Sequence, residues 1–215
     1  MAEARRRSPE GRMSLGQHLV ELRKRLGIIG FSVVIAAIAG WFLADPVWSA
    51  LSEPVLEIAS ERNRNADINY TSVTEAFDTK VAIAFVLGIV IAAPVWLYQI
   101  WSFFVPALMR KERRYALGFL GASLPLFFGG VTMGWWILPN VVLLLTSFAP
   151  QESATLLTAK VYLDFALKFV LAIGVGFVLP VFLVLLNFIG VLSAKAIIRG
   201  WRWAIVVIAL FTALA

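Results

Sequence analysis

Two glutamates, Glu21 and Glu112, each lie among basic residues next to a long apolar run. The first is in the stretch HLVELRKRL (residues 18–26), and the second is in RKERR (residues 110–114). A carboxylate binds the planar fork of an arginine guanidinium through two parallel hydrogen bonds, whereas a lysine ammonium has no such fork. Two carboxylates of this kind would therefore select a peptide with paired arginines over one with paired lysines.

The same residues also have a simpler interpretation. Glu21 is spaced to pair with Lys24 at i+3 or with Arg25 at i+4 on one helix. Exposed pairs of this kind contribute only about 0–1 kcal/mol to stability. The residue pattern alone leaves local pairing and peptide binding both open.

The residue types that the sequence lacks exclude several kinds of chemistry. It contains no cysteine, a single histidine (His18), no GxxxxGKS/T phosphate loop and no HExxH motif. Disulfides, iron–sulfur clusters, a histidine metal site and nucleotide hydrolysis are therefore not expected. For His18, an interfacial position is favoured over a role as a catalytic base. We predict that the protein is not an enzyme and holds no cofactor or metal.

The elements that must position the two glutamates are membrane-spanning helices. Of the 215 residues, 60% are hydrophobic and only 15% are charged, and the mean hydropathy is +0.85. A soluble domain has roughly 25% charged residues. We therefore predict an all-α polytopic membrane protein. Its net charge of +6 reflects basic loops on one side of the membrane rather than nucleic-acid binding.

Hydropathy divides the chain into a disordered basic tail, residues 1–13, and one transmembrane domain, residues 14–215. Leucines recur on one helical face of residues 14–26, which predicts a surface helix that runs into the first span. The expected spans are residues 26–43, 81–104, 115–138 and 162–188, with an incomplete one at 201–215. A polar outer stretch, Asp45 to Thr79, separates the first two spans and contains a short helix near residues 47–58.

The apolar run at residues 115–149 admits two arrangements. As one helix, its 35 residues would extend about 52 Å, against a hydrocarbon core of ~30 Å. It forms either a hairpin of two short spans or one span followed, after Pro139, by a helix at the outer interface. The single span is favoured, because it keeps Lys195, Arg199 and Arg202 on the same side as the other basic loops.

The basic residues also predict the orientation. With the N-terminus in the cytoplasm, 14 of the 19 bases lie on the cytoplasmic side, which the positive-inside rule favours. They are Arg5, Arg6, Arg7, Arg12, Arg23, Lys24, Arg25, Arg110, Lys111, Arg113, Arg114, Lys195, Arg199 and Arg202. This orientation places both Glu21 and Glu112 at the cytoplasmic boundary of a cell membrane.

A few residues within the predicted spans indicate how the helices pack. Asp164 and Lys168 are four residues apart and are expected to form a salt bridge with each other, while Gln99 is a candidate for an interhelical hydrogen bond. Three prolines should kink their helices, namely Pro94, Pro125 and Pro180. Close helix packing is expected at Gly129, Gly130, Gly134, Gly174 and Gly176.

Two long motifs resemble signatures of the twin-arginine translocase subunit TatC family. They are HLVELRKRL at residues 18–26 and APVWLYQIWSFFVPALMRKERR at residues 93–114. Pro54 and the run GVGFVLPVFLVLL at residues 174–186, which contains Pro180, fit the family as well, and the resemblance extends from about residue 14 to the end of the sequence. It implies a cup-like arrangement of six kinked helices.

The resemblance also implies a function and a site. Proteins of this family bind the twin-arginine signal peptides of folded precursors at the cytoplasmic face, work in a complex with single-span partners of the TatA/TatB type, and use the proton gradient for export. Glu21 and Glu112 align with the signal-binding glutamates. Arg23, Gln99, Phe103 and Pro94 fall in the same signatures as supporting positions, and Pro54 matches a position in the outer loop.

The sequence departs from the family pattern in two places. Many relatives have a glutamate two residues before the proline of the fourth span, where this chain has Val178. Asp164 cannot replace it, because 14 helical residues separate them by about 21 Å. The chain also ends within the expected fifth span, so the sixth is not present.

The main alternative function is a secondary transporter of a small solute or ion. Such transporters place charged groups near the bilayer midplane and contain internal repeats. The central membrane positions here are nearly uncharged and no convincing repeat is found, which favours the translocase interpretation. A third interpretation is a scaffold for other membrane proteins, which would have no affinity for a free signal peptide.

Overall fold

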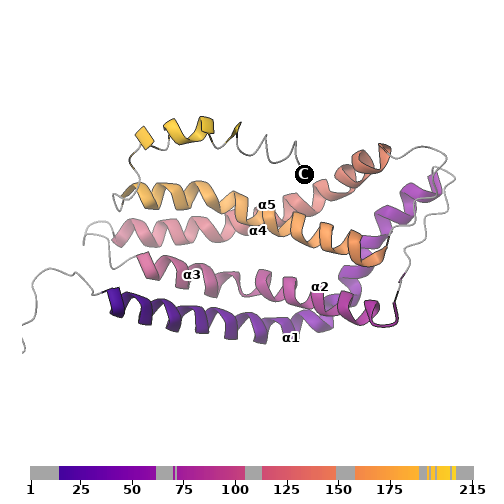
Figure 1. Cartoon of the computed structure of the whole chain (residues 1–215), viewed down its shortest axis with the longest axis horizontal. Helices are drawn as coiled ribbons and strands as arrows, with labels where there is room; N and C mark the ends of the chain where they lie inside the picture. Colours follow the sequence, from indigo (N-terminus) through magenta and orange to yellow (C-terminus); the bar gives the residue numbers. More distant parts are fainter. Residues whose placement is uncertain are drawn as a thin grey trace, which may run out of the picture.

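The computed structural model describes residues 15–61, 70, 72–104, 113–148, 158–188, 193, 195–196, 198–203 and 205–206. Its long helices are α1 (Leu15–Glu61), α2 (Glu75–Ile91), α3 (Ala93–Phe104), α4 (Arg113–Ser147) and α5 (Ala159–Phe188), which lie alongside one another (Figure 1). The basic tail at residues 1–13 and most of the predicted fifth span, residues 201–215, lie outside the described residues.

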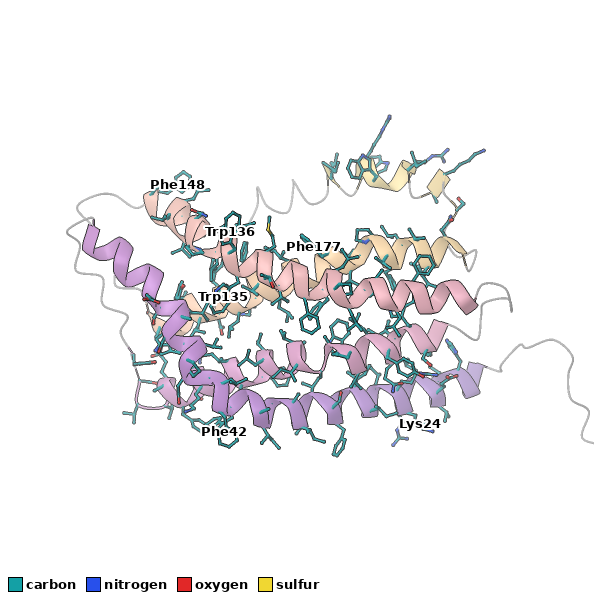
Figure 2. The ribbon with its side chains drawn as sticks, turned by 180° about the vertical axis from the view of Figure 1, so that it is seen from behind. Lys24, Phe42, Trp135, Trp136, Phe148 and Phe177 are labelled. Atoms are coloured by element: carbon teal, nitrogen blue, oxygen red, sulfur yellow. The ribbon has the colours of Figure 1, made fainter. Side chains whose placement is uncertain are left out.

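Three of these helices are long and apolar enough to cross a membrane, at His18–Glu53, Gly118–Leu145 and Ala159–Asn187, and the bent pair α2–α3 makes a fourth if it counts as one span. Many large apolar side chains point outward from them, among them Phe42 and Trp136, which are 77% and 69% exposed (Figure 2). Outward-facing apolar residues on helices whose backbone groups are bonded internally are what lipid requires. The predicted all-α polytopic architecture is confirmed.

The bundle has two ends, a near end and a far end. At the near end, on the left of Figure 1, α1 and α4 begin and α3 and α5 end. At the far end, α2 and α5 begin and α1 and α4 end.

Helix α1 continues well past the predicted end of the first span. It runs unbroken for 47 residues through Asp45 and Pro46, where we expected a polar stretch to begin, and changes direction in its last third (Figure 1). A proline inside a helix lacks the N–H of one backbone bond and usually bends the helix. The separate helix predicted near residues 47–58 is therefore part of α1, and Pro54 lies in this helix rather than in a loop.

The predicted second span is broken into α2 and α3 by a bend of 54° at Ala92. Pro94, the second residue of α3, cannot donate the backbone hydrogen bond that would continue α2. The carbonyl of Ala92 instead accepts from the N–H groups of Val95 and Trp96, at 2.9 and 3.1 Å, and the Trp96 indole donates to the carbonyl oxygen of Ile89 at 2.9 Å. The kink predicted near Pro94 is confirmed.

Helix α4 is a single helix of 35 residues that contains both Pro125 and Pro139. The predicted single span, rather than a hairpin, is confirmed, whereas the separate helix expected after Pro139 is continuous with that span. Its glycines pack it against α5. A Cβ added to Gly130 would lie 2.9 Å from the carbonyl oxygen of Ile173, whereas one added to Gly129 would meet nothing within 4 Å. Close packing is confirmed for Gly130, Gly134 and Gly174, and is wrong for Gly129 and Gly176.

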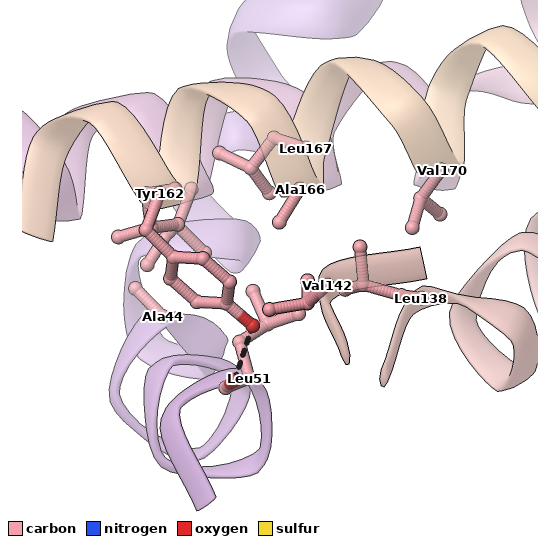
Figure 3. Close-up of a cluster of buried hydrophobic side chains, with 10 residues drawn as sticks. Ala44, Leu51, Leu138, Val142, Tyr162, Ala166, Leu167 and Val170 are labelled. Atoms are coloured by element: carbon pink, nitrogen blue, oxygen red, sulfur yellow. Dashed lines mark hydrogen bonds between the residues drawn. The ribbon is translucent and has the colours of Figure 1, made fainter. Parts of the chain in front are cut away.

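Two buried apolar clusters hold the helices together, one in each half of the bundle. The near cluster comprises Ala93, Leu97, Trp101, Phe127, Val178 and Leu185. The far cluster joins α1, α2, α4 and α5 through Ala44, Leu51, Ile83, Leu138, Val142, Tyr162, Leu163, Ala166, Leu167 and Val170. Within it the Tyr162 hydroxyl donates to the carbonyl oxygen of Leu51 at 2.7 Å (Figure 3).

Candidate functional site at the near end

The first turns of α1 carry an ion pair between Glu21 and Arg25. The guanidinium donates to the same carboxylate oxygen, Oε1, from Nη2 at 2.6 Å and from Nε at 3.1 Å. The side chains of Arg25 and Glu21 are 18% and 24% exposed, so the pair is largely shielded from solvent. The i, i+4 spacing, with the glutamate first, is the favourable order on a helix. The local pairing that the sequence left open is therefore present.

Gln99 connects this pair to α3. Its side-chain oxygen Oε1 accepts a hydrogen bond from Nη1 of Arg25 at 3.1 Å. All three guanidinium nitrogens of Arg25 are thus used, two on α1 and one on α3. The interhelical hydrogen bond predicted for Gln99 is confirmed, although its partner was not predicted, because sequence spacing does not indicate which helices meet.

An apolar cavity of about 290 Å³ lies beside the pair, between α1, α3 and α5. It is lined by Leu22, Arg25, Leu26, Ile29, Gln99, Ile100, Phe103 and Phe182. The Phe103 ring also lies against His18, with ring centroids 4.3 Å apart. Phe103 was singled out from the sequence. Phe182 was not, because it comes from α5, and only the fold reveals that α5 contributes to this cavity.

Arg23 and Lys24 do not share this arrangement. Arg23 is two residues from Glu21, which is about 200° around a helix, and its side chain is exposed. Lys24 points away from the bundle in Figure 2. Of the three consecutive bases in α1, only Arg25 contacts the glutamate in the described part of the chain.

The remaining predicted site residues lie apart from this cluster or outside the described residues. Glu112 is outside the described residues. Pro94 is exposed in the first turn of α3, and Pro180 is exposed inside α5. The structure thus brings together Glu21, Gln99 and Phe103 from the predicted set, and it adds Arg25 to them.

Val178, at the position where the family resemblance leads one to expect a glutamate, is 9% exposed in the near apolar cluster. Asp164 does not take its place, because it forms a salt bridge at 3.3 Å with Lys168, as predicted, in the first turns of α5. An apolar residue fits this position, since an unpaired carboxylate buried among these side chains would be costly.

The polar residues of the far end form a second cluster. Glu75 is 3% exposed and accepts hydrogen bonds from the backbone N–H groups of Ser72 and Lys160, each at 3.2 Å. Because Lys160 is in the first turn of α5, the carboxylate caps that helix from α2. Burial raises the pKa of the Tyr70 phenol above its ordinary value, and the charge of Glu75 adds to this effect.

Two ion pairs lie at the same end of the bundle as Glu75. Asp45 of α1 lies 2.7 Å from Lys80 of α2, whose ammonium also lies 5.1 Å above the centre of the Trp41 ring. Asp78 of α2 lies 3.6 Å from Lys160 of α5. Within the described ranges, no three His, Cys, Asp or Glu side chains are placed to hold a metal ion. The role of Glu75 was not predicted, because its partners come from distant segments.

The kinked, apolar helices define a polytopic α-helical membrane protein with a small charged site at one end. Comparison with protein families gives the class a name. Residues 17–215 match the model of the Sec-independent protein translocase protein TatC, and the chain belongs to this family.

Individual proteins of this family are also similar to the chain. The chain is 41% identical over 202 residues to TatC of Xylanimonas cellulosilytica, covering 94% of this chain and 73% of that protein. It is 42% identical over 211 residues to TatC of Rothia mucilaginosa, covering 98% and 72%. A crystal structure described as the twin-arginine translocase receptor TatC superposes with a TM-score of 0.80 at 30% identity, covering 92% of this chain and 87% of that one.

The chain is therefore a component of the Sec-independent, twin-arginine protein translocase. Its family is that of a multi-pass membrane protein of a transport complex, not of an enzyme. The comparisons favour this function over the secondary transporter that the sequence left as an alternative.

Proposed function

We propose that the near end faces the cytoplasm and binds the twin-arginine signal peptides of folded precursor proteins. Glu21 and Glu112 would each receive one arginine of the pair. Arg23, Gln99 and Phe103 would support the bound peptide, and export would follow in a complex with TatA/TatB-type partners, driven by the proton gradient across the cell membrane.

The observation that carries this proposal is that Glu21 already binds a guanidinium. The Arg25 fork contacts it at 2.6 and 3.1 Å in a largely shielded position. This pairing supports Glu21 as a partner for an arginine of a signal peptide. The similarity to a structure described as a twin-arginine translocase receptor supports the same function.

The apolar cavity beside Glu21 supports a signal peptide as the ligand. Signal peptides carry a basic region followed by an apolar one of roughly 7–15 residues. A carboxylate next to an apolar cavity of about 290 Å³ is complementary to that order of residues. A free cation or a small polar solute would gain nothing from contact with the apolar lining of the cavity.

The orientation rests on the positions of the bases. Arg23, Lys24 and Arg25 lie at the start of α1, at the near end, and Arg113 begins α4 there. The Lys/Arg-rich end of a membrane protein faces the cytoplasm. Precursors with signal peptides arrive from that side.

The test compares two peptides that differ only in the basic pair. A synthetic Arg-Arg signal peptide should bind the purified chain in detergent about tenfold or more tightly than its Lys-Lys counterpart, because lysine lacks the bidentate fork. Crosslinking of the Arg-Arg peptide should weaken in Glu112→Ala and should be unchanged in Glu53→Ala, an exposed glutamate at the far end of α1. Equal affinity for the two peptides would contradict the proposal.

A further inference from the structure

We propose that α1 and α2 bind one zwitterionic phospholipid towards the far end of the bundle. An acyl chain would lie in an apolar groove between the two helices, the phosphate on Lys80 and the headgroup ammonium on Asp45. The inference is independent of the proposed function, because it concerns the opposite end of the bundle and involves no peptide. It assigns to an exposed ion pair the role of selecting a lipid.

The groove between α1 and α2 has a volume of about 340 Å³ and an entirely apolar lining. It faces outward, since Phe42 on its α1 side and Phe85 on its α2 side are 77% and 52% exposed (Figure 2 labels Phe42). The lining residues are Val34, Ala37, Ile38, Trp41, Phe42, Val81, Ala84 and Phe85. The volume lies in the range of ligand sites, roughly 300–1,000 Å³. A hydrocarbon chain is the ligand whose chemistry matches this lining.

A second cavity, of about 240 Å³, lies one helical turn further towards the far end and carries charge. It is lined by Ala44, Asp45, Trp48, Tyr70, Ala76, Thr79, Lys80 and Ile83. Lys80 connects it to the groove, because its ammonium lies 5.1 Å above the centre of the Trp41 ring, which lines the groove. Asp45 lies 2.7 Å from that ammonium, and its side chain is 73% exposed. Both charges therefore lie where the headgroup of a lipid in the groove would be.

Thr79 adds a polar group that needs a partner. It is 5% exposed, and within the described ranges its hydroxyl oxygen, Oγ1, has no hydrogen-bond partner. Buried side-chain hydroxyls in proteins are in large majority hydrogen-bonded. A phosphate or ester oxygen of a phospholipid could accept a hydrogen bond from this hydroxyl.

The order of groove and charges fits one leaflet of a bilayer. The 11 residues from Val34 to Asp45 cover about 16 Å along α1, which is about half of the ~30 Å hydrocarbon core. Trp41, near the charged end of the groove, is of a residue type that gathers at the membrane–water interface. A lipid with its headgroup at Asp45 and Lys80 would thus extend its chain along the groove to the middle of the bilayer.

The paired charges favour a zwitterionic headgroup over an anionic one. The phosphate of either lipid can bind Lys80, but it is repelled by the carboxylate of Asp45 unless the headgroup also supplies a cation. An ammonium group supplies it. The rings of Trp48 and Tyr70, whose centroids are 6.1 Å apart at the same cavity, also attract such a group. Because exposed ion pairs are weak, Lys80 and Asp45 can separate to take up the headgroup at little cost.

The test uses phosphatidylethanolamine, which is zwitterionic, and phosphatidylglycerol, which is anionic, with identical acyl chains. The purified chain in detergent is mixed with equal amounts of the two lipids, and native mass spectrometry counts the lipid molecules bound. The main variant is Asp45→Asn, and the matched control is Asp164→Asn. Asp164 also pairs with a lysine, at 3.3 Å in the first turns of α5, but it lines neither of the two cavities.

The unmodified chain should bind phosphatidylethanolamine about three- to fivefold more than phosphatidylglycerol. Asp45→Asn should lose this preference, because the carboxylate that attracts the ammonium and repels the anionic lipid is gone. Asp164→Asn should keep it. A second variant, Lys80→Met, should bind less of both lipids, since the phosphate loses its partner.

Equal binding of the two lipids by the unmodified chain would overturn the inference, because it would mean that lipid covers the groove without selection. A preference that persists in Asp45→Asn, or that is lost equally in Asp164→Asn, would overturn it as well. None of these outcomes changes the expected binding of a signal peptide at the near end, so the proposed function is tested separately.

Discussion

The near and far ends of the bundle use polar residues in different ways. At the near end, the ion pair joins residues four apart on α1, and a single hydrogen bond reaches α3. At the far end, apart from the local pair of Asp164 with Lys168, the contacts join segments far apart in the sequence. Asp45 pairs with Lys80 and Glu75 binds the backbone of Lys160, 35 and 85 residues apart. The long-range links join separate helices, whereas the near-end pair is local to α1 and is joined to α3 by one hydrogen bond.

The apolar clusters are consistent with this difference. The far cluster packs four helices together around Tyr162, whose hydroxyl bonds to the α1 backbone. The near cluster packs α3, α4 and α5, while α1 contributes the lining of an open cavity instead. The near end of α1 thus borders a cavity between three helices.

The largest expected effect on stability is between the two ends, where α4 meets α5. Gly130→Ala should destabilise the protein by about 1–3 kcal/mol, because the new methyl group would meet the α5 backbone. Gly129→Ala, one residue away and open, should be neutral or stabilising by up to about 1 kcal/mol. Thermal unfolding in detergent measures both. Equal losses would mean that close packing does not hold α4 against α5.

An effect of similar size is expected at the far end. Glu75→Gln should destabilise the protein by about 1–3 kcal/mol, because the buried carboxylate that accepts two backbone N–H groups loses its charge. Asp45→Asn breaks an ion pair whose acid is 73% exposed and should cost less than about 1 kcal/mol. Both variants should keep their affinity for the Arg-Arg peptide. A loss of affinity in Glu75→Gln at unchanged stability would contradict the view that the far end serves stability and the near end serves peptide binding.

Much of the helical architecture was predictable, because it depends on local sequence. The kink at Pro94 and the salt bridge between Asp164 and Lys168 follow from one or two turns of helix. The i, i+4 spacing of Glu21 and Arg25 likewise indicated their pairing, though not which of two interpretations of Glu21 to prefer.

The features that escaped prediction depend on tertiary contacts. Helix α1 continues through Asp45 and Pro46 because its later turns pack into the far cluster, where Leu51 is 2% exposed. Local helix-ending signals are overridden by such packing. The partners of Glu75 and the place of Phe182 in the cavity lining likewise come from segments that meet only in the folded chain. The role of Glu112 remains a prediction.

The most direct test of the central claim, that the near-end carboxylate serves binding and not stability, is the substitution Glu21→Gln. Affinity for the Arg-Arg signal peptide and the midpoint of thermal unfolding are measured on the same preparation. We expect the affinity to fall by about tenfold or more, because glutamine cannot form the charge-assisted pair. Arg25 can still donate to the amide oxygen of glutamine, which limits the loss of stability to about 1–1.5 kcal/mol. Unchanged affinity, or a loss of affinity that merely follows a large loss of stability, would contradict the claim.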